Sequence, residues 1–155
     1  MTFIVLLDSG PLGLVTNPKE SAESLACKDW LKQLIRQGNQ ALVPAITDYE
    51  VRRELRLYDK INGLRNLDTL VAAAGYLALT PQALWLAADF WAQARKTGMP
   101  TADRFALDAD MLLTAQAKTV DPEEWGMPGA TIVVATTNVG HLSRFADARL
   151  WQNIS

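Results

Sequence analysis

Three acidic residues stand where strands are expected to meet helices: Asp8, Glu50 and Asp110. Asp8 directly follows the apolar run Phe3–Leu7, and a run of this kind without alternation is typical of a strand buried on both faces. Open α/β sheets place their chemistry at the carboxyl ends of such strands. Glu50 lies in the helix predicted after the second strand, which predicts that its carboxylate comes near the same edge as Asp8.

Several carboxylates that meet at one edge repel one another unless a positive charge lies between them. Oxygen ligands in a chain with one cysteine and one histidine suit Mg²⁺ or Mn²⁺ and disfavour zinc. Such a cation favours the hydrolysis of phosphodiester bonds. The chain has neither a Walker loop nor a GxGxxG segment, the two common phosphate-binding loops.

Each acid also has a purely structural interpretation, which the sequence leaves open. Asp8 can start an Asx turn before Gly10. Glu50 can close a capping box with Thr47 at the start of a helix. Asp108 and Asp110 fall near the start of a predicted helix, where acids are common caps; being two residues apart, they point to nearly opposite sides, so one of them is expected to face the site.

The elements that position these residues are predicted from apolar periodicity and from caps. Strands are expected at 3–7, 41–46 and 130–136, with a possible edge strand at 148–154. Helices are expected at 21–37, 49–58, around 67–74, from Pro81 behind a Thr80 cap, and at 106–117, with a loop at 100–104. Strands separated by helices require crossover connections. The predicted fold class is therefore α/β, a three-layer α/β/α sandwich around a mainly parallel sheet.

Length and composition limit the classes of protein to consider. The 155 residues fit one domain, 1–155, and 49% hydrophobic residues are ordinary for a globular protein. No stretch is long enough for a membrane span, the start lacks the features of a signal peptide, and Cys27 is the single cysteine, so no membrane partner and a cytoplasmic location are expected.

The net charge of −2 gives no overall basic field, so a site for a polyanion must be local. Arg52, Arg53 and Arg104 belong to two loose groups of basic residues and are candidate contacts to a nucleic-acid backbone. The alternative is that these cations belong to ordinary solvated helix faces.

Four segments, taken in order, resemble the PIN-domain family, which includes the toxins of VapBC toxin–antitoxin pairs. Leu6–Ser9 followed by Leu12 resembles the family's opening strand with its acid, and 43–55 resembles its strand-to-helix acidic segment. Residues 110–115 are similar to its Asp-x-Leu-Ile-Ala-Ala segment, and 136–138 to its Thr-x-Asp/Asn turn. The resemblance covers nearly the whole chain.

This resemblance implies a PIN-like fold in which Asp8, Glu50 and Asp110 bind Mg²⁺ or Mn²⁺ and act in catalysis. It further implies supporting roles for Ser9, Asp108, Thr136 and Asn138. The chain has Asn138 at or near a position where many relatives have an acid.

The leading hypothesis is a metal-dependent endoribonuclease that hydrolyses RNA, as the toxin of a toxin–antitoxin pair. Its expected partners are RNA, a small antitoxin and a second copy of the chain. A second hypothesis is a PIN-like domain that binds RNA or protein and has weakened or lost nuclease activity. A third is an unrelated doubly wound domain whose acids serve only as caps.

Overall fold

The computed structural model describes residues 1–98 and 104–155, and the side chains of all of these except 104–106. The strands are β1 (Phe3–Leu7), β2 (Gln40–Pro44), β3 (Tyr76–Leu77), β4 (Thr131–Thr136) and β5 (Ala148–Leu150). The α-helices are α1 (Ser9–Thr16), α2 (Ala22–Arg36), α3 (Ala45–Leu57), α4 (Ile61–Ala74), α5 (Pro81–Lys96) and α6 (Arg104–Thr119). Short 3-10 turns cover Pro122–Trp125, Leu142–Arg144 and Trp151–Asn153.

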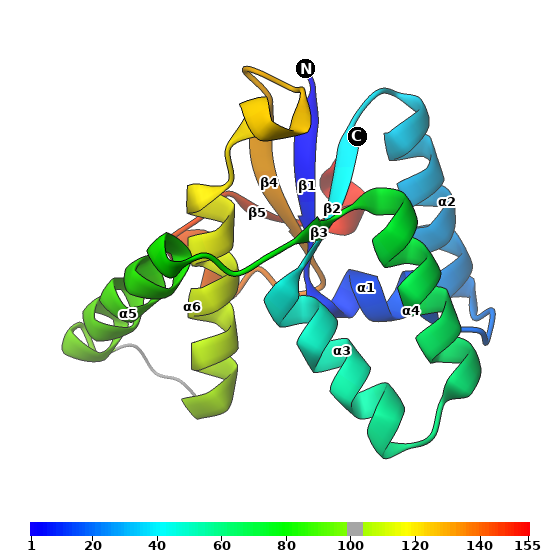
Figure 1. Cartoon of the computed structure of the whole chain (residues 1–155), viewed down its shortest axis with the longest axis horizontal. Coiled ribbons are helices and arrows are strands. Elements are labelled where there is room, and N and C mark those ends of the chain that lie inside the picture. The colour runs from blue at the N-terminus through cyan, green and yellow to red at the C-terminus, as the bar shows by residue number, and fades with distance from the viewer. Residues whose placement is uncertain (99–103) are drawn as a thin grey trace.

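The five strands form one parallel sheet in the order β3-β2-β1-β4-β5. The chain builds outward from β1 through β2 to β3, then crosses to the other side of β1 to add β4 and β5. The strand order thus reverses between β1 and β4, the place where open parallel sheets leave a crevice at their carboxyl ends. In Figure 1, β1 runs down from the N-terminus into α1, so this edge lies at the bottom, beside α1 and α3.

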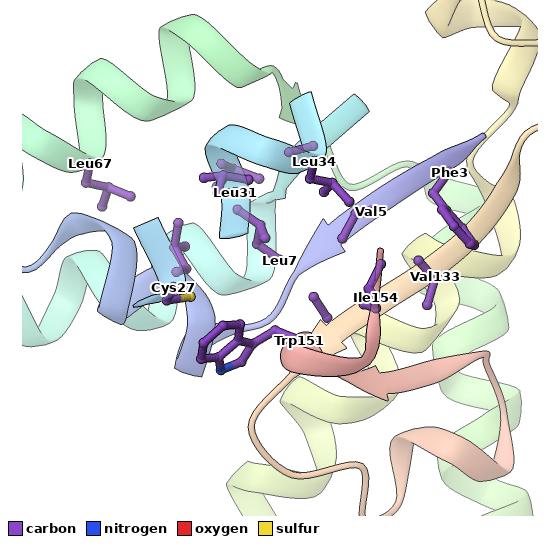
Figure 2. Close-up of a cluster of buried hydrophobic side chains, with 14 residues drawn as sticks. Phe3, Val5, Leu7, Cys27, Leu31, Leu34, Leu67, Val133, Trp151 and Ile154 are labelled. Atoms are coloured by element: carbon purple, nitrogen blue, oxygen red, sulfur yellow. The ribbon is translucent and has the colours of Figure 1, made fainter. Parts of the chain in front are cut away.

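One face of the sheet is covered by α1, α2 and α4. Alternate side chains of β1, namely Phe3, Val5 and Leu7, point to this face and pack with buried residues of the helices. Figure 2 shows Cys27, Leu31, Leu34 and Leu67 from α2 and α4 gathered there with Trp151 and Ile154 from the C-terminal segment. The Trp30 indole N–H donates to the Ile154 carbonyl at 2.8 Å, which anchors the C-terminus against α2.

The opposite face is covered by α6. The other side chains of β1, Ile4 and Leu6, pack there with Leu113 and Ala117 of α6. Helix α5 lies outside α6 and packs on it through buried alanines and Met111 (Figure 1). The arrangement is the predicted three-layer α/β/α sandwich, with a sheet that is parallel throughout.

Several predicted helix boundaries are confirmed by their capping hydrogen bonds. Ser21 caps α2 by accepting from the Ser24 N–H, and Gly38 follows the helix at φ 89°, in the left-handed conformation that glycine adopts without strain. Thr80 caps α5 by accepting from the Ala83 N–H, with Pro81 in the first helical position. Local chemistry therefore sets these ends.

Other predictions about elements were wrong. Residues 9–16 form α1, although Gly10 and Pro11 indicated a turn; a proline in the first turn loses no helical hydrogen bond, because the N–H groups there have no helical acceptor. The strand β2 ends at Pro44, so α3 begins at Ala45 instead of Thr47. The short strand β3 was missed, and α4 begins at Ile61, earlier than the helix predicted around 67–74.

Helix α6 begins at Arg104, two residues before the predicted start. The loop predicted at 100–104 lies mainly outside the described residues. Within the part of the chain that is described, none of the helices combines the length and apolar character needed to cross a lipid bilayer.

Candidate active site at the carboxyl edge

Asp8 lies at the end of β1, beside the place where the strand order reverses. Its Oδ2 accepts a hydrogen bond from the Thr136 hydroxyl at 2.7 Å, and its Oδ1 accepts from the Ser9 N–H at 2.8 Å. The second bond caps α1, so the structural interpretation of Asp8 is correct in part. A carboxylate offers about four acceptor positions, so these two bonds fix the group and leave lone pairs for a ligand.

Thr136 ends β4 and holds two neighbours in place. Its hydroxyl, which is buried, donates to Asp8 and accepts from the Asn138 N–H at 3.1 Å. Asn138 itself is exposed, and its main chain rather than its side chain makes this bond. Thr136 therefore positions Asp8 across the reversal point.

Glu50 is the sixth residue of α3 and takes no part in a capping box. Helix α3 begins behind Pro44, and the Thr47 hydroxyl donates to the Pro44 carbonyl at 3.1 Å. Burial, together with the negative charge of Asp8, raises the pKa of Glu50 to about 7; Asp110 and Glu54 add to the rise, and Arg53 opposes it. The capping interpretation of Glu50 is thus wrong, because the helix starts two residues earlier.

Asp110 lies in the second turn of α6, too far from the helix start to act as a cap. Burial and then the negative charge of Asp8 raise the pKa of Asp110 to about 6. Asp108 is exposed on the same helix. As the helical spacing predicted, one of the two aspartates lies close to Asp8 and Glu50 and the other points to solvent.

The carboxylate of Asp8 is near enough to Glu50 and Asp110 for its charge to raise the pKa of both. As the side chains lie, however, no three Asp, Glu, His or Cys residues in the described part of the chain are close enough to hold a metal ion together. The site is therefore an acidic cluster with unmatched charge, in a more open arrangement than a closed three-ligand cage.

A cavity of about 550 Å³ opens beside this cluster, between α1 and α3. Ser9 and Glu50 line it at the end nearest the acids, and Arg53 and Glu54 continue its wall along α3. The cavity is therefore continuous with the acidic cluster through Glu50.

The three arginines predicted to contact a nucleic-acid backbone have different surroundings. Arg52 bonds to Asp48 at 3.0 Å and to Asp68 of α4 at 2.8 Å, so its guanidinium holds α3 against α4. Arg53 points to the cavity and lies over the Tyr49 ring at 5.3 Å. Arg104 opens α6, but its side chain lies outside the described residues. Arg53 therefore remains a candidate contact, whereas Arg52 is committed to other residues.

Three further lining residues were not singled out from the sequence: Gly13, Lys19 and Tyr58; Lys60, which also lines the cavity, belongs to the same loose group of basic residues as Arg52 and Arg53. Lys19 follows α1, and Tyr58 and Lys60 belong to the connection between α3 and α4. A basic or aromatic residue on a loop carries no signal of its own, because only the packing of α1 against α3 brings these loops together.

Comparison with known proteins gives matches in structure alone. No family model matches the sequence, and no curated protein matches it. A chain of VapBC2 from Rickettsia felis, solved bound to a fragment of promoter DNA, is 14% identical with a TM-score of 0.67, over 96% of this chain and 99% of that one. FitAcB from Neisseria gonorrhoeae is 19% identical with a TM-score of 0.64, over 97% and 99%.

VapBC-1 from nontypeable Haemophilus influenzae is 14% identical with a TM-score of 0.65, over 97% of this chain and 100% of that one. The similarity thus extends over nearly the whole of each chain, and at these identities it concerns the fold. The chain has the PIN-like three-layer α/β/α fold.

Proposed function

We propose that the chain is a metal-dependent endoribonuclease that hydrolyses RNA phosphodiester bonds, as the toxin of a toxin–antitoxin pair. The observation that carries the proposal is the juxtaposition of Asp8 with Glu50 and Asp110. These residues come from three separate elements, and burial followed by the negative charge of Asp8 raises the pKa of both Glu50 and Asp110 at the reversal point of the sheet.

The chemistry of the three acids fits a hard divalent cation. Each offers carboxylate oxygens. Burial, and after it the negative charge of Asp8, raises the pKa values of Glu50 and Asp110, and a cation would neutralise that charge. Mg²⁺ is often held by one or two carboxylates, with water and substrate phosphate completing its coordination. The open spacing of the cluster suits this mode better than a closed cage, so Asp8 with Glu50 or Asp110 would hold the ion.

When bound, such a cation stabilises the negative charge that develops during phosphodiester hydrolysis and activates the attacking water. The protein's own part is to position groups. Thr136 and the Ser9 N–H hold the Asp8 carboxylate in one orientation. Arg53, on the cavity wall, is placed to contact a phosphate of the RNA backbone.

The experiment is cleavage of a structured RNA pool in Mn²⁺, Mg²⁺ or EDTA by wild type, Asp8→Asn and Asp110→Asn. Asp29→Asn is the matched control, because Asp29 is an exposed acid on α2. We expect cleavage by wild type and the control only when metal is present, and a loss of about 100-fold or more in the two site variants. Equal cleavage by all four proteins would exclude the proposed metal site.

A second candidate function is binding of RNA or protein without cleavage. The observation that favours it is the lack, among the described side chains, of three acids spaced to hold one ion, together with Asn138 near the fourth position. Metal binding by the wild-type protein without any RNA cleavage would support this candidate over the nuclease.

The toxin role rests on the two-component names of the similar structures, VapBC2, VapBC-1 and FitAcB. We propose a small antitoxin as partner, encoded by a short reading frame next to this gene. Co-expression tests this: the two products should co-purify, and growth arrest by this chain alone should be relieved by the partner.

A homodimer is also part of the proposal. Leu84 and Trp85 are exposed on α5, and Trp85 is 68% exposed despite its large apolar ring. Sedimentation of wild type and Trp85→Ser tests whether this face joins two copies; a monomeric wild type would rule the dimer out.

A further inference from the structure

We propose that the cavity between α1 and α3 receives a nucleotide of the RNA strand next to the phosphodiester that is cleaved. The inference rests on the proposed ribonuclease function and adds to it a binding subsite formed by Gly13, Lys19, Tyr58 and Lys60. The cavity, of about 550 Å³, begins at Ser9 and Glu50 and is therefore continuous with the acidic cluster.

The first observation is the space left by Gly13. Helix α1 contains two glycines, each of which costs a helix about 1 kcal/mol relative to alanine. Gly10 is explained by packing, because a Cβ there would lie 2.5 Å from the Thr137 Oγ1. At Gly13 an added Cβ would meet nothing within 4 Å, and the residue lines the cavity. The protein itself does not use this space, and a glycine allows a ligand to approach the backbone.

The second observation is the charge of the cavity. Lys19, Arg53 and Lys60 line it together with the acids Glu50 and Glu54, in a chain whose net charge is −2. None of the three cations forms an ion pair with another side chain that the structure describes. With Glu50 engaged at the acidic cluster, the rest of the cavity has an excess of positive charge. This complements a phosphate backbone rather than a neutral peptide.

The third observation is the aromatic and apolar part of the lining. Tyr58 is 66% exposed and lies at the rim, while Val51 and Leu55 form apolar wall. Exposed aromatic rings are the usual stacking surface for unpaired bases. An aromatic ring beside unpaired cations is thus the combination that single-stranded nucleic acid requires.

Lys60 and Lys19 are carried on turns fixed by hydrogen bonds. The Lys60 N–H donates to the Leu55 carbonyl at 2.8 Å, and the preceding residue, Asp59, has a φ of 52°. Together these features end α3 in a Schellman motif. The Lys19 N–H donates to the Asn17 side chain at 2.9 Å, and Asn66 of α4 donates to the Thr16 carbonyl. The cavity is therefore largely formed before a ligand arrives.

The test measures RNA binding apart from cleavage, by fluorescence anisotropy of a short fluorescein-labelled single-stranded RNA of mixed sequence in EDTA. A size series at position 13, Gly13→Ala, Gly13→Leu and Gly13→Phe, should lower the affinity in that order, with a loss of about tenfold for phenylalanine. Gln33→Phe, at an exposed position of α2, is the control for adding an aromatic ring elsewhere on the surface. Thermal unfolding of each variant shows whether it remains folded.

Tyr58→Leu should weaken binding by about tenfold, whereas Tyr58→Phe should bind as tightly as wild type because the ring is kept. Lys60→Ala should reduce the slope of log affinity against log salt by about 0.7, the value for one phosphate contact in a single strand. Lys32→Ala, an exposed lysine of α2, should leave the slope unchanged.

Unchanged RNA affinity in folded Gly13→Phe, Tyr58→Leu and Lys60→Ala would overturn the inference. That result would leave the nuclease proposal intact if wild type still cleaves RNA. Weakened binding in these variants, with no cleavage by wild type in any metal, would support the subsite and contradict the nuclease.

Discussion

Helix α3 carries acidic residues on two faces with opposite surroundings. On one face Asp48 bonds to Arg52, which also bonds to Asp68 of α4. On the other, Glu50 faces Asp8 and Asp110 without a cation at bonding distance among the described residues, and its pKa is raised to about 7. The first face uses charge to join two helices, while the second leaves charge unmatched. Unmatched, partly buried charge destabilises a fold, and proteins keep it where a ligand supplies the counter-charge.

The largest expected effect comes from removing an unmatched acid. Asp110→Asn should lower RNA cleavage about 100-fold or more, while the free energy of unfolding at pH 7 in EDTA stays the same or increases. The reason is that a partly buried carboxylate with a pKa near 6 destabilises the folded state at pH 7, by on the order of 1–3 kcal/mol. Urea unfolding and cleavage assays on the same preparation measure both quantities. A variant that is less stable yet fully active would show that Asp110 is structural.

The unmatched charge of Glu50 and Asp110 should also make the free energy of unfolding depend on pH. The folded pKa values of Glu50 and Asp110, about 7 and 6, lie above their ordinary values of 4.5 and 3.8. The folded state therefore keeps protons that the unfolded state has lost, and these two acids lower stability as the pH rises from about 4 to 7. We expect the urea midpoint in EDTA to fall over this range and to recover when Mn²⁺ is added at pH 8. The double variant Glu50→Gln, Asp110→Asn should remove both effects, and a midpoint insensitive to Mn²⁺ in wild type would contradict them.

Arg52 and Arg53, adjacent in α3, should have opposite effects on stability and on RNA affinity. Arg52→Ala should reduce the free energy of unfolding by about 1 kcal/mol, because it breaks two partly exposed ion pairs, and should leave RNA affinity unchanged. Arg53→Ala should leave stability nearly unchanged and weaken RNA binding several-fold. Chemical denaturation and anisotropy on both variants measure the two effects. The reverse pattern would mean that the paired arginine, instead of the one at the cavity, contacts the substrate.

The smallest effects are expected at the two glycines of α1. Gly10→Ala should destabilise the fold by about 1 kcal/mol, because the new methyl group would displace Thr137. Gly13→Ala should stabilise it by a similar amount, since the space is open and alanine favours the helix. Thermal unfolding of both variants checks the difference in sign. Two changes of the same sign would show that the space at Gly13 is not empty in solution.

The elements that could be predicted are those whose signals are local. The strand β1 was predicted at its observed bounds because five consecutive apolar residues need cover on both faces. The caps at Ser21 and Thr80 were predictable because a side-chain oxygen satisfies helix N–H groups within the next three residues. Helix α1 was not, because its Gly10 and Pro11 are tolerated only in the first turn of a helix that packs against Thr137.

The sequence alone determined which acids to consider and the class of fold that would hold them, since strand and helix periodicity are properties of neighbouring residues. It could not decide between capping and ligand roles. The tertiary structure excluded the capping role for Glu50 and Asp110, because the true starts of α3 and α6 move both residues out of the capping positions. It alone also formed the cavity beside them. The packing of α1 on α3 brings together Gly13, Lys19 and Lys60 from distant parts of the chain, and no local pattern encodes that contact.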